Sequence, residues 1–226
     1  MSIGYCIFID CIAFILFALL HSFLASFTIK SFLIKRIGNA MAFYRIIYNV
    51  FFLWLFFYLF ETLPRPDAEL FELRLPWDII ILIPQFLALA GIIWTFRFFS
   101  LFEFAGLSQI KRWKDGNYNE GHDRKTIEEE IRTEDLRNGK ISKDVFDEKL
   151  TLKIEGPYKI VRHPLYLFTI IFLILRPTMD LFYLVFLIFI IAYFYIGSFY
   201  EEKKLVSAFG DQYRKYQASV PRLFPH

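Results

Sequence analysis

Five apolar stretches dominate the pattern of hydrophobic and polar positions along the chain. Four of them, residues 3–29, 43–60, 79–96 and 181–200, are close to the roughly 20 residues that a helix needs to cross a bilayer. The fifth, residues 164–175, spans only about 18 Å as a helix, against a hydrocarbon core of about 30 Å. The pattern predicts an all-α integral membrane protein with about five transmembrane helices, the last two forming a helical hairpin.

The composition agrees with this class of protein. Of the 226 residues, 56% are hydrophobic and 20% aromatic, with 29 Phe, which is typical of a multi-pass membrane protein. The net charge of +3 gives no reason to expect a nucleic-acid partner; the lipid bilayer is the expected one. The first apolar stretch is too long for the apolar region of a cleaved signal peptide.

Basic residues between the apolar stretches predict the orientation. The connection after the first stretch, counted to include Arg45 at the start of the second, has four basic residues and no acid, whereas the connection after the second is acidic overall. Residues 97–162 carry 14 basic residues. Because cytoplasmic loops are enriched in Lys and Arg, we expect the N-terminus outside and the C-terminus in the cytoplasm, in a bacterial-type inner (plasma) membrane.

The charge pattern also suggests three parts. Residues 1–114 hold the first three membrane helices, and residues 154–226 hold the last two and the C-terminal tail. Between them, residues 115–153 alternate acidic and basic positions, which is typical of a solvated helical hairpin inserted on the cytoplasmic side. The tail is expected to end in an interfacial helix.

Residues 155–166 form the densest polar and ring-bearing run in the chain. Gly156 begins a turn, and Pro164 suits the first position of a helix that starts after His163. Arg162 and His163 therefore stand at a helix N-terminus, where free backbone N–H groups favour an anion. An interfacial anchor of Arg, His and Tyr is the alternative interpretation.

Polar residues inside the first two apolar stretches form a second candidate group. His21 lies in the inner half of the first stretch, and Arg45 and Asn49, four residues apart, begin the second. Ionisable residues at such depth usually face a cavity. Snorkelling of Arg45 and helix–helix hydrogen bonding by the other two are the alternatives. Cys6 and Cys11 have neither a metal-site nor a disulfide spacing, so no metal site is predicted.

The carboxylates that follow the last apolar stretch, Glu201 and Glu202, are expected at the end of that helix. A carboxylate is unfavourable at a helix C-terminus. We therefore expect them to pair with Arg162, another arginine or a bound cation.

Several motifs together resemble the isoprenylcysteine carboxyl methyltransferase superfamily, integral-membrane enzymes that use S-adenosylmethionine. The C-terminal half carries Gly-Pro-Tyr from Gly156, Val-Arg-His-Pro-Leu-Tyr from Val161, and the Glu pair with its following tail. The N-terminal half is similar to the NnrU-like and methanethiol S-methyltransferase branch at His-Ser-Phe-Leu-Ala-Ser from His21 and Gly-Leu-Ser-Gln from Gly106.

The resemblance implies a site for S-adenosyl-L-methionine. The cofactor-binding residues that it implies are Gln109, Thr151, Leu152, Lys153, Tyr158, His163, Pro164, Leu165, Tyr166 and Glu201. Arg162 and Glu202 join this set from their own chemistry, because an arginine at a helix N-terminus suits the carboxylate of the cofactor and a glutamate suits its sulfonium. The deeper polar group supplies the candidate catalytic residues, His21, Arg45 and Asn49. His21 is a candidate base for a thiol proton, and stabilisation of a thiolate by Arg45 is the alternative.

The expected function is methyl transfer from S-adenosylmethionine to a small thiol or another lipophilic acceptor. Enzymes of the superfamily that methylate prenylcysteine use an Arg four residues before the conserved Glu, but this chain has Gly197 there. Methylation of an isoprenylcysteine or lipid carboxylate, or of a phospholipid, is the alternative. A non-catalytic transport or assembly protein with the same fold is the second alternative.

Overall fold

The computed structural model describes residues 2–98, 101–116, 118, 152 and 154–224 of the chain. Apart from Asp115, Gly116, Tyr118 and Leu152, the predicted insertion at 115–153 lies outside these residues. The described elements are the helices α1 (Ile3–Ala25), α2 (Phe27–Ile37), α3 (Tyr44–Thr62), α4 (Trp77–Ile80), α5 (Leu82–Phe96), α6 (Leu101–Ala105), α7 (Leu107–Lys114), α9 (Pro164–Ile174), α10 (Leu181–Phe209) and α11 (Asp211–Ser219), the 3-10 helices η1 (Gly38–Phe43) and η3 (Gly156–Lys159), and the strands β1 (Glu69–Glu72) and β2 (Thr178–Asp180).

The all-α membrane class predicted from the sequence is confirmed. Within the described ranges, four helical stretches are long and apolar enough to cross a membrane: Ile3–Ala25, Thr28–Thr62, Trp77–Phe96 and Leu181–Ser207. The fifth apolar helix, α9, has 11 residues, or about 16 Å, and is as short as the sequence predicted. The chain is therefore a multi-pass membrane protein.

Two helix boundaries differ from the prediction. The first helix ends at Ala25 and a separate helix, α2, begins after Ser26, whose backbone is extended at φ −69° and ψ 153°. The last membrane helix continues to Phe209, so Glu201 and Glu202 lie inside α10 rather than at its end. The prediction that these carboxylates stand at an unfavourable helix C-terminus is therefore wrong.

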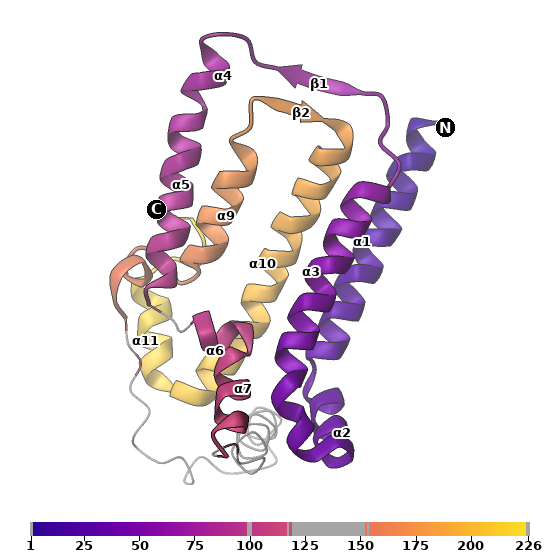
Figure 1. Cartoon of the computed structure of the whole chain (residues 1–226). Coiled ribbons are helices and arrows are strands. Elements are labelled where there is room, and N and C mark those ends of the chain that lie inside the picture. The colour runs from indigo at the N-terminus through magenta and orange to yellow at the C-terminus, as the bar shows by residue number, and fades with distance from the viewer. Residues whose placement is uncertain (1, 99–100, 117, 119–151, 153, 225–226) are drawn as a thin grey trace. The chain divides into compact units, whose positions relative to one another are not determined.

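The described chain divides into two compact units, and each is described by itself. Unit 1 comprises Met1–Ile15, Leu63–Phe99 and Thr151–His226. Figure 1 shows α9 beside both α5 and α10, with the β1–β2 ribbon at one end of these helices and α11 at the other. The contact between α5 and α9 is close because Gly91 has no side chain: a Cβ there would lie 2.5 Å from the Phe168 ring.

The two antiparallel strands of unit 1 were not predicted from the sequence. Glu72 pairs with Thr178, and Glu69 with Asp180. Asp180 also caps α10, because its Oδ1 accepts a hydrogen bond of 2.7 Å from the backbone N–H of Tyr183. The ribbon thus fixes the start of α10 and the end of α9.

Unit 2 comprises Leu16–Thr62 and Ser100–Leu150. Ile34 of α2 and Met41 of η1 form a small buried core, against which Tyr44 packs. The hydroxyl of Tyr44 donates to the carbonyl of Leu24 at 2.6 Å, and that of Tyr48 donates to the carbonyl of His21 at 3.0 Å. These bonds join α3 to the second half of α1.

Candidate active site

The turn before α9 depends on a glycine. Gly156 has φ +56°, and a Cβ at this position would lie 2.2 Å from the Phe98 ring. Only glycine adopts this conformation without strain and leaves room for the ring. The following 3-10 turn places the carbonyl of Tyr158, which accepts a hydrogen bond of 2.6 Å from the hydroxyl of Tyr216 on α11.

The start of α9 is held by residues 220–223, which we call the C-terminal strap. The backbone N–H of Arg162 donates to the carbonyl of Pro221 at 2.9 Å, and that of His163 donates to the carbonyl of Arg222 at 3.0 Å. Pro164 has no N–H. Some of the N–H groups expected to be free at this helix start therefore donate within the protein. Fewer of them are left to bind an anion.

Glu202 is the centre of the largest polar network in the described chain. Its carboxylate accepts from Arg162 Nε at 2.8 Å and Nη2 at 3.2 Å, and from Arg222 Nε at 3.2 Å and Nη2 at 3.0 Å. Gln217 Nε2 donates to it at 2.8 Å. Its side chain is 3% exposed and that of Arg162 is 8%. The expected pairing of a glutamate with Arg162 is thus confirmed, for Glu202.

Arg162 has further acceptors beyond this carboxylate. Its Nη1 donates to the carbonyls of Gln217 and Val220. Its guanidinium is therefore directed at protein groups, which favours a structural task over the carboxylate-binding task expected from the sequence.

His163 and Glu201 complete the cluster. The buried His163 ring places Nε2 3.2 Å from Glu202 Oε1 and Nδ1 3.4 Å from Glu201 Oε2. The Tyr166 hydroxyl donates to Glu201 Oε1. The Tyr166 ring stacks with that of His163, at a centroid distance of 5.3 Å, and with that of Phe194, at 4.4 Å. Two neighbouring rings therefore hold its orientation.

The two glutamates differ in their surroundings. The side chain of Glu201 is 52% exposed, whereas that of Glu202 is 3%. Among the described residues, no Lys or Arg forms a salt bridge with Glu201. Glu201 is thus an accessible carboxylate at the edge of a buried, charge-compensated network.

Two phenols near the glutamate pair stay protonated. Burial, and then the charge of Glu201, raise the pKa of Tyr158 above its ordinary value. Burial is also the main cause that raises the pKa of Tyr216 to about 12. At neutral pH both phenols therefore act as neutral hydrogen-bonding groups.

The remaining residues of the implied cofactor set lie nearby in the chain. Pro164 is buried, and Leu165 and Leu152 are half-buried. Thr151 and Lys153 lie outside the described residues. Sequence reasoning missed Gln217 and Arg222 as members of the Glu202 network, although Arg222 is a lone basic residue inside the strap.

In unit 2, Arg45 and Asn49 contact the same short helix. Arg45 Nη1 donates to the carbonyl of Glu103 at 2.8 Å, and Asn49 Nδ2 donates to the carbonyl of Phe104 at 3.0 Å. Their spacing of four residues places both on one face of α3, as predicted. Because they satisfy carbonyls at the end of α6, these contacts favour a structural role.

Gln109 belongs to a second polar network in unit 2. The carboxylate of Glu103 accepts from Gln109 Nε2 at 2.8 Å and from both terminal nitrogens of Arg112 at 3.1 Å. The hydrogen bond from Arg112 is the main cause that lowers the pKa of Glu103. Gln109 Oε1 is buried and has no hydrogen-bond partner among the described residues.

His21 lies among aromatic rings of unit 2. Its ring centroid is 4.7 Å from that of Phe52 and 5.2 Å from that of Tyr48. These ring contacts of His21 are with α3, whereas Arg45 and Asn49 bond to carbonyls of α6.

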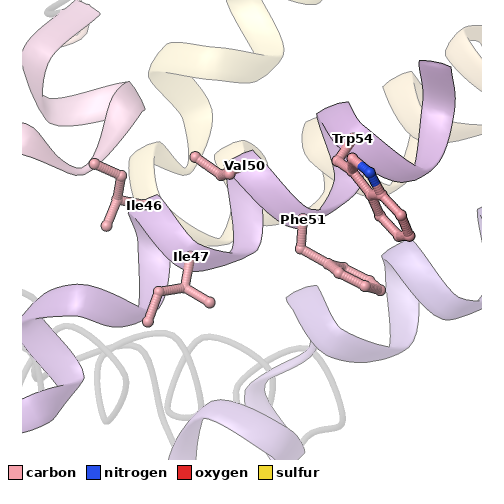
Figure 2. A pocket seen from close by; sticks show the side chains of 5 residues that line it. All are labelled: Ile46, Ile47, Val50, Phe51 and Trp54. Carbon is pink, nitrogen blue, oxygen red and sulfur yellow. The ribbon is translucent and has the colours of Figure 1, made fainter. Parts of the chain in front are cut away.

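An apolar hollow lies along α3 (Figure 2). It is lined by Ile46, Ile47, Val50, Phe51 and Trp54. All five belong to a helical stretch that is apolar enough to span a membrane, so lipid chains would contact this surface. The five lining side chains include no ionisable or nucleophilic group.

Comparison with known proteins finds relatives named methanethiol S-methyltransferase. A methanethiol S-methyltransferase of Pseudomonas deceptionensis is 44% identical over 68 residues, which cover 30% of this chain and 26% of the relative. That of Pseudomonas sp. (strain GM41(2012)) is 41% identical over 78 residues, covering 34% and 30%. Methanethiol S-methyltransferase 1 of Bradyrhizobium diazoefficiens is 40% identical over 68 residues, covering 30% and 24%.

The match is partial in both directions. The chain covers less than a third of the length of each of these three relatives. No family model matches the chain, and no solved structure matches it. Over the matched stretch, the resemblance found in the sequence is confirmed: this chain is a homologue of proteins of the methanethiol S-methyltransferase branch.

Proposed function

We propose that the protein is an integral-membrane methyltransferase that transfers the methyl group of S-adenosylmethionine to a small thiol. The names of its relatives supply the reaction class and the thiol acceptor. The observation in the structure that carries the proposal is the Glu201 carboxylate, which is half-exposed and has no salt bridge to Lys or Arg in the described chain.

The chemistry of the cluster fits this cofactor. S-adenosylmethionine supplies a methyl group on a positively charged sulfonium, which a carboxylate attracts. Glu202 is already compensated by two arginines, and the Tyr166 ring is stacked with those of His163 and Phe194. Glu201 is therefore the group of the cluster best suited to face the sulfonium, with Tyr158 and Tyr166 orienting this side of the site.

The protein would lower the barrier mainly by alignment and by excluding water. Methyl transfer is an in-line displacement, so holding the acceptor sulfur in line with the methyl group supplies much of the catalysis. A site at the end of membrane helices also gives an apolar thiol access from the lipid. In this proposal Arg45 and Asn49 position α6, and His21 packs between the aromatic rings of unit 2.

The test is binding and turnover by the purified full-length chain in detergent. Glu201→Gln should weaken binding of S-adenosylmethionine about tenfold, as for loss of one charged interaction of about 1.5 kcal/mol or more. Binding of S-adenosylhomocysteine, which lacks the sulfonium charge, should change less than about threefold. The matched control is Asp211→Asn, an exposed carboxylate on α11.

The outcomes separate the candidate functions. Radiolabelled cofactor should label methanethiol or ethanethiol in preference to a prenylcysteine or a phospholipid. Label in the prenylcysteine or lipid alone would replace the thiol acceptor in the proposal. A wild-type protein that binds neither cofactor form and labels no acceptor would refute methyltransferase activity.

A further inference from the structure

His163 is a buried imidazole with a carboxylate on each ring nitrogen. Nε2 lies 3.2 Å from Glu202 Oε1, and Nδ1 lies 3.4 Å from Glu201 Oε2. The side chain of His163 is 7% exposed. The ring therefore connects the accessible Glu201 to the interior of the network.

A neutral imidazole carries one hydrogen, so it can donate to only one of these two carboxylates. Glu202 already accepts from Arg162 and Arg222, whose positive charges favour its ionised form. In the proposal below, the hydrogen of a neutral His163 lies on Nε2, which has the shorter of the two distances to a carboxylate. The lone pair of Nδ1 is left facing Glu201, and a proton taken up there would lie between the ring and a second carboxylate.

Among the described residues, the charged and titratable groups that contact this ring or its two carboxylates come from four segments. Glu201 and Glu202 come from α10, Tyr166 from α9, Arg162 from the residue before the ring, and Arg222 from the strap. Of these, the arginines contact Glu202, whereas Tyr166 contacts Glu201. The charge of Glu201 also acts on the phenols of Tyr158 and Tyr213. The protonated ring would thus donate to a carboxylate on each side.

Methylation of a thiol requires a proton acceptor. The sulfur forms a bond to the methyl group while the old bond from the methyl group to the donor sulfur breaks and leaves its electron pair on that sulfur. The S–H proton must leave the acceptor. Most aliphatic thiols are protonated at neutral pH, so a base beside the sulfur would accelerate the step.

We propose that Glu201 takes this proton from the thiol and passes it to Nδ1 of His163, which Glu202 holds in the receptive tautomer. The proposal rests on the proposed thiol methylation. Glu201 is the catalytic base, and His163 and Glu202 are positioning residues that act through it. After the transfer, the proton resides on an imidazolium between two carboxylates, and it leaves to water through the exposed Glu201.

The experiment compares two thiols whose acidities differ. His163→Gln keeps a nitrogen donor for Glu202 and has no titratable ring. Glu201 would keep its carboxylate but lose the ring that takes the proton from it, so kcat with ethanethiol at pH 7 should fall about a hundredfold, the lower end of what general base catalysis contributes. With thiophenol, which is largely ionised at pH 7, kcat should fall less than about tenfold. The ethanethiol rate should recover as pH rises toward the range in which this thiol ionises.

A merely structural role for His163 would give a different result. Equal losses of kcat with both thiols, and no recovery at high pH, would overturn the proposal while wild-type turnover upheld the methyltransferase. His21→Gln is the comparison variant: a thiol-dependent loss there, with none for His163→Gln, would assign the base to His21 instead. Affinity for S-adenosylhomocysteine, measured for each variant, shows whether the cofactor site is still folded.

Discussion

Replacing Glu202 by Gln should destabilise unit 1 strongly, because this carboxylate holds two arginines. Glu202 Oε1 accepts from Arg162 Nε and Arg222 Nε, and Oε2 accepts from Arg162 Nη2, Arg222 Nη2 and Gln217 Nε2. Whichever way the new amide is oriented, its NH2 group would face donors and leave them unsatisfied. Arg162, 8% exposed, would become a buried charge without its counter-ion.

The expected loss is about 3–5 kcal/mol in the free energy of unfolding, the usual cost of breaking a buried ion pair from one side. This corresponds to more than a hundredfold in the unfolding equilibrium. Glu201→Gln is the matched control, because it is the adjacent residue and is 52% exposed. It keeps an oxygen for the Tyr166 hydroxyl, so its loss should stay below about 1 kcal/mol.

The assay is unfolding of the purified protein by SDS titration from a mild detergent, followed by tryptophan fluorescence. A double-mutant cycle with Arg162→Gln should show a coupling free energy of at least about 1 kcal/mol. If Glu202→Gln costs no more than Glu201→Gln, the network does not stabilise this unit and the reasoning is refuted.

Three further outcomes are expected. Gly106→Ala, at φ +92° and with a new Cβ 2.8 Å from the backbone of α3, should lower stability by more than Gly116→Ala, at φ +69° but in open space; thermal unfolding of the two variants checks this, and equal losses would contradict it. Arg112 lowers the pKa of Glu103, so this pair contributes stability above the ordinary carboxylate pKa and loses it as pH falls through the lowered value; Glu103→Gln should flatten this part of a pH titration of unfolding, and an unchanged profile would count against the pair. A cysteine at Asn138 should react with an impermeant reagent only after the cells are opened, and labelling of intact cells would reverse the proposed orientation.

The sequence predicted the membrane helices better than their ends. Long apolar runs define a spanning helix by themselves, and four of the expected helices are confirmed. No proline or glycine lies at Ser26, between α1 and α2. The hydrophobic pattern therefore predicts that the first helix continues to residue 29. The charged residues after Tyr200 predict that the last membrane helix ends there, whereas α10 continues to Phe209.

The sequence predicts which stretch of the chain forms the site, but not the network of contacts within it. Arg162 and a glutamate were expected to pair, yet adjacent residues on a helix point about 100° apart, and the pattern does not say which glutamate faces inward. The contact of Arg222 with Glu202 spans 20 residues, across the turn from α10 into α11 and the strap. Such contacts arise from tertiary packing, which local sequence patterns do not predict.

The strap makes the order of synthesis matter for this site. Every candidate spanning helix in the described chain is translated before residues 220–223, which supply the carbonyl groups for Arg162 and His163 and the side chain of Arg222. A nascent chain that has just completed α10 can already be inserted in the bilayer. Its Glu202 then has Arg162 as a partner but still lacks Arg222 of the strap. Ribosome stalling between α10 and the strap would therefore yield an integrated protein whose site is unassembled.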